Sequence, residues 1–128
     1  MKDVIFRGSS GRIHHFSLHR PDEDFPVSAA VYCFARPVAG GRGWAPVFLS
    51  RTANLKARLN GHERWADARL LGATHILIHK REERDAREFV EADLLNSLKP
   101  VLNAPVLEAE PAEAKERFVR RPRLVWAA

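Results

Sequence analysis

Four side chains in the middle of this chain have the types and the order needed to cut a phosphodiester bond. Tyr32 is a phenol and Arg58 is a permanent cation, while His62 is an imidazole and Glu91 is a carboxylate. A phenol or an imidazole can take a proton from an attacking water, and an arginine can stabilise charge on phosphate oxygens. A carboxylate oxygen is a preferred ligand of hard divalent cations. The elements that carry these residues must therefore bring them together.

Two strand-like segments and the loop between them are expected to position the tyrosine. Residues 27–36 contain a continuous apolar run, which is typical of a central strand covered on both faces. Residues 37–43 are rich in glycine, as in a loop, and residues 44–50 return as a second strand. An antiparallel hairpin of this kind would bring Tyr32 close to Phe48.

A short helix is expected to carry the arginine. Thr52 has the type of an N-cap residue, and residues 53–60 fit a two-turn helix in which Arg58 lies beside the apolar stripe. His62 follows Arg58 by four positions and could share that face, although Gly61 suits the end of a helix.

The clearest helix covers residues 82–98 and is stopped by Pro100. Its apolar side is broad and is formed by Ala86, Phe89, Val90, Leu94, Leu95 and Leu98. Glu91 lies at the margin of this side, where a carboxylate costs free energy unless something pairs with it. From periodicity alone, a solvated glutamate at the rim is the better interpretation.

Three further elements complete the predicted secondary structure. Residues 4–18 predict an N-terminal hairpin, and residues 74–79 predict a strand. Residues 63–71 predict a short helix with Trp65 and Leu70 as its apolar positions.

The histidines of the predicted strands do not indicate a metal site. His14 and His15 are adjacent and would point to opposite faces of a strand, so they cannot easily share an ion, and His19 falls at the strand end. His75 and His79 are better explained as residues of a sheet surface.

The stretch from residue 30 to residue 103 resembles the GIY-YIG nuclease domain of excision-repair, homing and restriction endonucleases. Ala30-Val31-Tyr32 stands where that family has Gly-Ile-Tyr, and Phe48-Leu49-Ser50 stands where it has Tyr-Ile-Gly. Three positions depart from the pattern. Ala30 and Ser50 replace glycines, and Phe48 replaces a tyrosine whose hydroxyl could hold or activate the nucleophilic water.

The helical part of the resemblance lies downstream of these strands. Residues 52–59 are similar to the helix that carries the family's catalytic arginine, here Arg58, and His62 falls on a histidine often found four residues later. Glu91 stands at the family's metal-binding glutamate. The run Lys99–Asn103 looks like the closing Pro-x-x-Asn motif. An ordered set of separated motifs is more specific than either tripeptide alone.

The resemblance implies an α+β fold with a small mixed, largely antiparallel sheet flanked by helices. One domain with an N-terminal hairpin would cover residues 1–103, and a basic tail would cover residues 104–128. The implied activity is that of a metal-dependent endonuclease that hydrolyses DNA phosphodiester bonds with magnesium or manganese.

Each site residue has an implied role in this family setting. Glu91 would bind the metal ion, and Arg58 would stabilise the charge on the phosphate. Tyr32, or His62 beside it, would take the proton from the attacking water. Two residues would support the site, Phe48 and Asn103. Four basic residues would contact backbone phosphates, although each taken alone is better explained as a solvated surface residue: Arg51, Lys56, Arg64 and Arg69.

The composition fits DNA as the partner and excludes other classes. Lys and Arg number 21 against 16 acidic residues, and the sequence pI is about 10.0. Cys33 is the single cysteine, which excludes an internal disulfide and a cysteine-based zinc site. No apolar run approaches the ~20 residues that span a bilayer, and the N-terminus lacks the apolar core of a signal peptide. We expect a cytoplasmic protein with no small-molecule cofactor beyond a divalent metal.

Two alternatives to an active nuclease stay open. Phe48 and Ser50 favour a nucleic-acid-binding module that derives from such a nuclease and is catalytically impaired. A protein-interaction domain on the same fold is the third interpretation, against which the basic pI argues only weakly.

Overall fold

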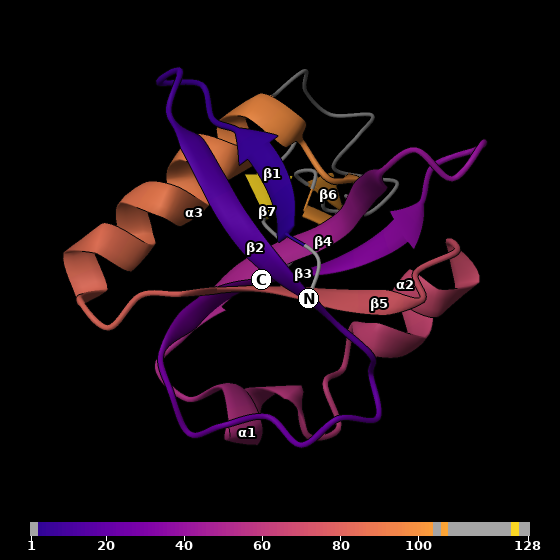
Figure 1. Ribbon diagram of the computed structural model, residues 1–128, viewed down its shortest axis with the longest axis horizontal. Helices are drawn as coiled ribbons and strands as arrows, with labels where there is room; N and C mark the ends of the chain where they lie inside the picture. Colours follow the sequence, from indigo (N-terminus) through magenta and orange to yellow (C-terminus); the bar gives the residue numbers. More distant parts are fainter. Residues whose placement is uncertain (1–2, 104–105, 108–123, 126–128) are drawn as a thin grey trace, which may run out of the picture.

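A five-stranded sheet forms the centre of the protein, as seen in the computed structural model, which describes residues 3–103, 106–107 and 124–125 (Figure 1). The strand order is β1-β2-β5-β3-β4, and every pairing is antiparallel. The strands are β1 (Asp3–Arg7), β2 (Ile13–His19), β3 (Ala30–Pro37), β4 (Trp44–Thr52) and β5 (His75–Lys80). The helices are α1 (Leu55–Leu59), α2 (Trp65–Leu70) and α3 (Arg84–Leu98), followed by the 3-10 turn η1 (Val101–Asn103).

The α+β class is confirmed, but the sheet is antiparallel throughout rather than mixed. Both β4 and β5 pair with β3 in the antiparallel sense, so they run in the same direction on either side of it. The segment that contains α1 and α2 links these two strands across the intervening β3. The strands that share a direction are therefore not neighbours, and no parallel pairing forms.

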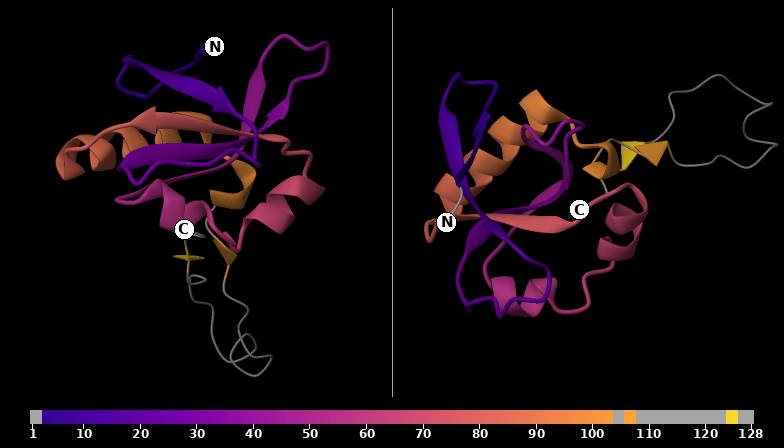
Figure 2. Two further views of the ribbon diagram at one scale, coloured as in Figure 1. Left: turned by 60° about the horizontal axis from the view of Figure 1, so that its bottom comes forward. Right: turned by 45° about the vertical axis from the view of Figure 1, so that its right-hand side comes forward.

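The central position predicted for the first strand of the site is confirmed. β3 lies between β5 and β4, and its residues from Ala30 to Ala35 are buried. Alternate side chains enter two different clusters. Tyr32 and Phe34 pack with α1 and α2, whereas Val31 and Cys33 pack with α3. The helices thus cover opposite faces of the sheet (Figure 2).

Two details of the helical segments differ from the sequence predictions. The N-cap of α1 is Asn54, whose Oδ1 accepts from the backbone N–H of Ala57 at 3.1 Å. Thr52 does not cap the helix, because it still belongs to β4 and pairs with Ala30. Leu70 is 86% exposed, since α2 is short and buries Ala68 instead.

The remaining predicted elements agree with the structure. The N-terminal hairpin is formed by β1 and β2, and α3 ends at Leu98, before Pro100. The short strands β6 (Val106–Leu107) and β7 (Leu124–Val125) pair with each other. The rest of the predicted basic tail lies outside the described residues. Within the described ranges, the helices are all too short or too polar to traverse a lipid bilayer.

Candidate functional site

Tyr32 and His62 meet in a buried hydrogen bond, although they belong to separate elements. Tyr32 lies on β3 and faces α1, while His62 lies in the turn after that helix. Gly61 has a positive φ of 65°, which favours glycine and lets the chain turn back toward the sheet. The Tyr32 Oη and His62 Nε2 atoms are 2.7 Å apart. The structure therefore brings together two of the four residues predicted to do chemistry.

His62 is held as a neutral ring. Burial lowers its pKa to about 4, and the nearby charge of Arg58 acts in the same direction. Its Nδ1 atom accepts from the backbone N–H of Arg64 at 3.0 Å, so the ring proton lies on Nε2 and is donated to Tyr32. Nδ1 is also 3.2 Å from Glu63 Oε2, a contact that becomes a hydrogen bond only when Nδ1 carries a proton. We assign the neutral form from the fixed backbone donor.

Tyr32 is fully buried and neutral. Burial raises the pKa of its phenol to about 12, while the charge of Arg58 works in the opposite direction. The Ser50 hydroxyl also lowers this pKa, in agreement with the cross-strand pairing of Ser50 with Tyr32. The phenol is consequently a weak acid on its own, and a partner must take its proton if it is to act as a base.

Arg58 is engaged by Glu63 rather than by His62. Its Nη1 and Nη2 atoms donate to the two carboxylate oxygens of Glu63 at 2.8 and 3.1 Å. These hydrogen bonds lower the pKa of Glu63 to about 2. The predicted helical face shared by Arg58 and His62 does not form, because α1 ends at Leu59. The Glu63 carboxylate contacts both Arg58 and His62 instead.

Glu91 lies on α3 and pairs with Arg51 of β4. Its Oε1 atom accepts from Arg51 Nε at 3.0 Å, and its side chain is 18% exposed. Burial raises the pKa of Glu91, and the charge of Arg51 opposes that effect. The Ser50 hydroxyl lowers the pKa of Glu91 as well as that of Tyr32.

The residues around Glu91 fit one divalent cation held mainly by its carboxylate. The donors are hard oxygens, from the carboxylate and the neighbouring Ser50 hydroxyl, and Arg51 engages only one carboxylate oxygen. Magnesium keeps several waters and is commonly bound by one or two carboxylates together with substrate phosphates. The part of the chain that the structure describes contains no cluster of three or more His, Cys, Asp or Glu ligands.

Phe48 and Asn103 both contact the central hairpin. Phe48 is fully buried, with its ring centroid 6.3 Å from that of Tyr32 and 5.4 Å from that of His62. Asn103 bonds the backbone of Leu49 twice, accepting from its N–H at 2.6 Å and donating to its carbonyl at 2.7 Å. These two hydrogen bonds resemble those that a neighbouring strand would make, and they hold η1 against β4.

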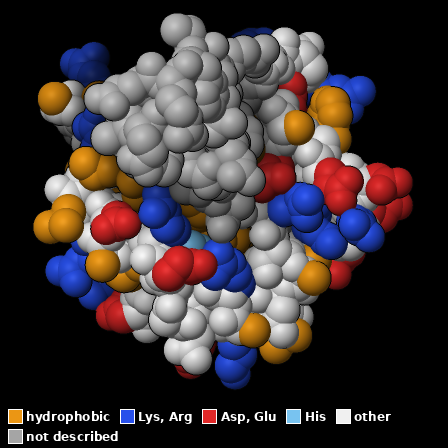
Figure 3. Space-filling view, turned by 180° about the vertical axis from the view of Figure 1, so that it is seen from behind, with side chains coloured by type: hydrophobic (Ala, Val, Ile, Leu, Met, Phe, Trp, Pro, Cys, Tyr) orange, Lys and Arg blue, Asp and Glu red, His pale blue; other side chains and the backbone are white. Residues whose placement is uncertain are grey.

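The four predicted phosphate-contacting residues are in different surroundings. Arg51 pairs with Glu91, and Arg64 donates to the Leu102 carbonyl at 3.2 Å. Lys56 and Arg69 are exposed on α1 and α2. Figure 3 shows basic and acidic side chains alternating over one face of the molecule, around a small exposed histidine surface. The described part of this face therefore shows no uniform positive patch.

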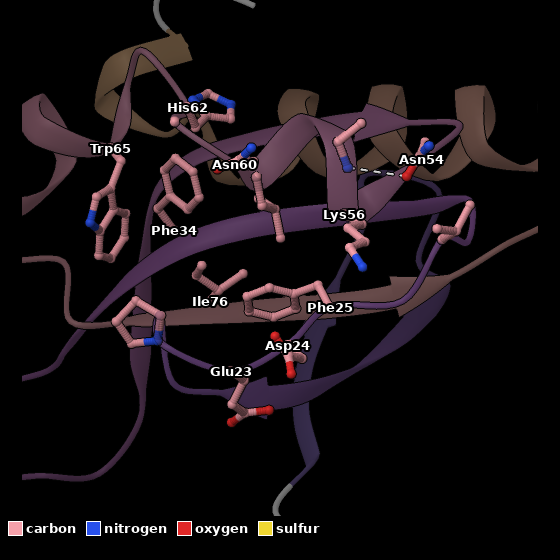
Figure 4. Close-up of a pocket in the computed structure, with 15 residues that line it drawn as sticks. Glu23, Asp24, Phe25, Phe34, Asn54, Lys56, Asn60, His62, Trp65 and Ile76 are labelled. Atoms are coloured by element: carbon pink, nitrogen blue, oxygen red, sulfur yellow. Dashed lines mark hydrogen bonds between the residues drawn. The ribbon is translucent and has the colours of Figure 1, made fainter.

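A cavity of about 570 Å³ lies beside α1 (Figure 4). Lys56, Ala57, Leu59 and Asn60 line it, whereas their neighbour Arg58 does not. Its apolar wall is formed by Phe25, Phe34, Trp65 and Ile76. His62 also lines this cavity, whereas its hydrogen-bond partner Tyr32 does not.

A second histidine–carboxylate pair lies between the N-terminal hairpin and α3. Asp93 accepts from His14 Nε2 at 2.9 Å and from the backbone N–H of Ser10 at 2.7 Å. It also accepts from the hydroxyls of Ser9 and Ser10, at 3.1 and 2.8 Å. An added Cβ on Gly8 would lie 1.8 Å from an Asp93 oxygen, so the backbone approach requires glycine.

Sequence reasoning missed Glu63 and Asp93. Glu63 follows His62 directly and lies five positions after Arg58, so an acid next to a predicted base was the available signal. Asp93 gave no signal of this kind, because its partners are 79 to 84 positions away.

Comparisons with protein-family models, with curated proteins and with solved structures find no match to this chain. The functional interpretation therefore depends on the geometry of the site and on the motifs in the sequence.

Proposed function

We propose that this protein is a metal-dependent endonuclease of the GIY-YIG type that hydrolyses DNA phosphodiester bonds. The observation that carries the proposal is the 2.7 Å hydrogen bond between Tyr32 and a neutral His62. Arg58 reaches His62 through the Glu63 carboxylate. Glu91 lies on α3, which packs on the other face of the sheet, and it enters the proposal through the family resemblance.

Tyr32 and His62 would act as one proton acceptor. This step requires the other tautomer of His62, in which Nδ1 gives up the Arg64 N–H and donates its own proton to Glu63, so that Nε2 is free to accept. The attacking water then gives a proton to Tyr32 Oη while the phenol proton passes to His62 Nε2. The resulting imidazolium is stabilised by the Glu63 carboxylate at 3.2 Å. General-base help of this kind typically contributes about 10²- to 10⁴-fold.

Arg58 and Glu91 would supply the electrostatic part of catalysis. Arg58 presents two N–H groups in a planar fork, which matches a pair of phosphate oxygens. It would stabilise the charge that builds on these oxygens as the bond to the leaving group breaks. Glu91, assisted by Ser50, would hold magnesium or manganese. When bound, such a cation polarises a phosphate oxygen and makes a bound water more acidic.

Cleavage assays test this proposal directly. The purified protein is incubated with supercoiled plasmid and with a branched DNA, with and without magnesium. We expect nicked or linear products only when the metal is present, and none from Tyr32→Phe or Arg58→Ala purified in the same way. Arg42→Ala is the matched control, because it removes an exposed arginine of the β3–β4 loop that has no proposed phosphate contact. No cleavage by the wild-type protein on either substrate would contradict the proposal.

DNA binding should depend strongly on salt and weakly on sequence. Contacts to about four phosphates predict a roughly 100-fold loss of affinity between 50 and 200 mM salt. The measurement is fluorescence anisotropy with several unrelated duplexes, in calcium to suppress cleavage. An affinity that does not change with salt, or no binding at low salt, would favour the protein-interaction interpretation.

The second candidate function is a nucleic-acid-binding module with impaired turnover. Phe48 favours it, because this ring packs against both Tyr32 and His62 without offering a hydroxyl. Salt-dependent binding in an assay that detects no cleavage, with either magnesium or manganese, would support this candidate over the nuclease.

A further inference from the structure

The guanidinium of Arg58 is already occupied. Glu63 binds it at two points, 2.8 and 3.1 Å, through both terminal nitrogens. The same carboxylate lies 3.2 Å from Nδ1 of His62. A negative group therefore sits between the cation and the imidazole, at the place where the substrate's charge would have to be received.

A carboxylate in this position resembles part of the substrate. Arginine binds carboxylates and phosphates in the same way, with two parallel N–H donors directed at two oxygens. A phosphodiester has two non-bridging oxygens that can take the place of the two Glu63 oxygens. Both anions cannot hold the same two donors at once, so they must compete.

Glu63 is also placed where it can move away. Its side chain is 59% exposed, and it lies in the turn between α1 and α2, outside either helix. The pairing bridges only five positions of the chain, and the Arg58 side chain is itself 30% exposed. An exposed ion pair contributes little to stability, so a phosphate with additional contacts can displace it.

We propose that Glu63 is a built-in competitor for the substrate phosphate: it holds Arg58 in the free protein and is released when a phosphodiester binds. This inference rests on the proposed function and adds a means of regulating that site. Weak anions, and DNA held by only one phosphate, would fail to open the pair. After release, Glu63 keeps its place beside His62, so that binding and base activation are coupled.

A Glu63 that competes for Arg58 and a Glu63 that only orients Arg58 predict opposite changes in phosphate affinity when Glu63 is removed. If Glu63 only orients Arg58, its removal weakens phosphate binding. If Glu63 competes, its removal strengthens binding, by about 5-fold for an ion pair of ordinary surface strength. The rate at saturating DNA should not rise with the affinity and should fall, because the same variants lose the carboxylate that stabilises the His62 imidazolium.

The experiment compares Glu63→Gln and Glu63→Ala with Asp67→Asn. Asp67 is the matched control because it is a nearby exposed acid that pairs with Arg64, at 3.5 Å, and not with Arg58. All three variants remove one negative charge. Alanine is included because the amide oxygen of glutamine can still accept one hydrogen bond from Arg58. Melting temperatures establish that each variant is folded.

Two ligands are titrated, inorganic phosphate and a short DNA duplex in calcium, while the Arg58 side-chain N–H signals are followed by NMR. We expect both Glu63 variants to bind each ligand about 5-fold more tightly than wild type, and Asp67→Asn to change affinity by less than about 2-fold. Equal gains in all three variants, or weaker binding in the Glu63 variants, would overturn the proposal.

The design separates this inference from the proposed function. If the wild-type protein binds DNA and cleaves it but the Glu63 variants bind no more tightly, only the competitor role is lost. If no variant cleaves DNA, the nuclease proposal fails, and the phosphate titration still decides whether Glu63 competes for Arg58. Absence of any phosphate response at Arg58 in the Glu63 variants would also overturn the competitor role.

Discussion

Two histidine–carboxylate pairs lie in this molecule, and they differ in how completely their carboxylates are bonded. Asp93 is buried and accepts four hydrogen bonds, one of them from His14. Glu63, beside His62, is mostly exposed and is bonded by the guanidinium of Arg58. Asp93 has no lone pair left for a ligand, whereas the partner of Glu63 can be exchanged.

The same contrast appears within a single helix. Glu91 and Asp93 are two positions apart on α3 and therefore lie on different sides of it. Asp93 fastens the tip of the β1–β2 hairpin to the helix, while Glu91 faces β4 and shares one oxygen with Arg51. A buried polar group with all its partners fixes structure. A half-buried carboxylate with one exchangeable partner is suited to bind a cation.

The largest effect on activity is expected at Glu91. Glu91→Gln keeps the size of the side chain but removes the charge that would hold the metal, so we expect single-turnover cleavage to fall at least ~10³-fold. The free energy of unfolding should change by less than about 1 kcal/mol, because the Arg51 pair lies at the surface. Glu88→Gln is the control, since Glu88 also approaches Arg51, at 3.7 Å, from the same helix. Retained cleavage in Glu91→Gln would remove Glu91 from the mechanism.

The reverse pattern is expected at Asp93. Asp93→Ala leaves His14, Ser9 and Ser10 without their acceptor, which should lower the free energy of unfolding by about 2–4 kcal/mol. Urea denaturation measures this loss. The cleavage rate per folded molecule should stay within about 2-fold of wild type, because no Asp93 contact reaches the phenol. A variant as stable as wild type would show that the buried network contributes nothing net.

Stability as a function of pH should separate the two pairs. The pKa of His62 is lowered to about 4 in the folded protein, from about 6.5 in the unfolded chain. Between these values the unfolded chain binds the extra proton, so the free energy of unfolding falls as pH is lowered, by at most ~1.4 kcal/mol per pH unit. His62→Gln should remove this slope. Identical profiles for the two proteins between pH 6.5 and about 4 would contradict the assignment.

The Asp93 pair should respond only in stronger acid. Burial would raise the pKa of Asp93, but hydrogen bonds from His14, Ser10 and Ser9 outweigh it and hold the pKa well below its usual range. A lowered carboxylate pKa stabilises the fold above the unfolded value of about 3.9, and that stability is lost as pH falls below it. Asp93→Asn should therefore flatten the profile below pH ~4 and leave the His62 window unchanged.

The fold was largely predictable because its strongest signals are local. The apolar run of β3 and the long amphipathic α3 are recognisable from sequence periodicity alone, and both are confirmed. The errors fall in short elements. Thr52 and Leu70 were assigned by residue type, but a strand pairing and the small contact area of α2 decided their positions.

The candidate site was less predictable because its contacts cross between elements. His62 reaches Tyr32 from a turn rather than along a helix face, and periodicity does not describe a turn. Glu63 could not be assigned to Arg58 without the direction of both side chains. Residue types are thus the basis of the chemistry proposed, which stays a prediction, whereas the pairing of the charged side chains required the structure.

A smaller effect on activity than at Glu91 is expected at Phe48, where the substitution Phe48→Tyr adds one oxygen atom. This ring is fully buried and packs against both Tyr32 and His62, where the resemblance would place a second tyrosine. A hydroxyl added there must find a partner, because an unpaired buried phenol costs about 1–3 kcal/mol. If it reaches the attacking water or the phosphate, Phe48→Tyr should raise the single-turnover rate by about 10-fold, equivalent to ~1.4 kcal/mol of transition-state stabilisation.

The measurement for Phe48→Tyr uses saturating magnesium, so that product release does not hide the chemical step, and a thermal melt reports whether the hydroxyl is paired. Tyr32→Phe in the same background is the decisive partner variant. It keeps one phenol in the site but removes the one bonded to His62, so we expect activity to vanish. A melt lowered without any gain in rate would mean that the hydroxyl is buried without a partner. Phe48 would then have only a structural role, in packing against Tyr32 and His62. Tyr32 and His62 would suffice for the proton transfer.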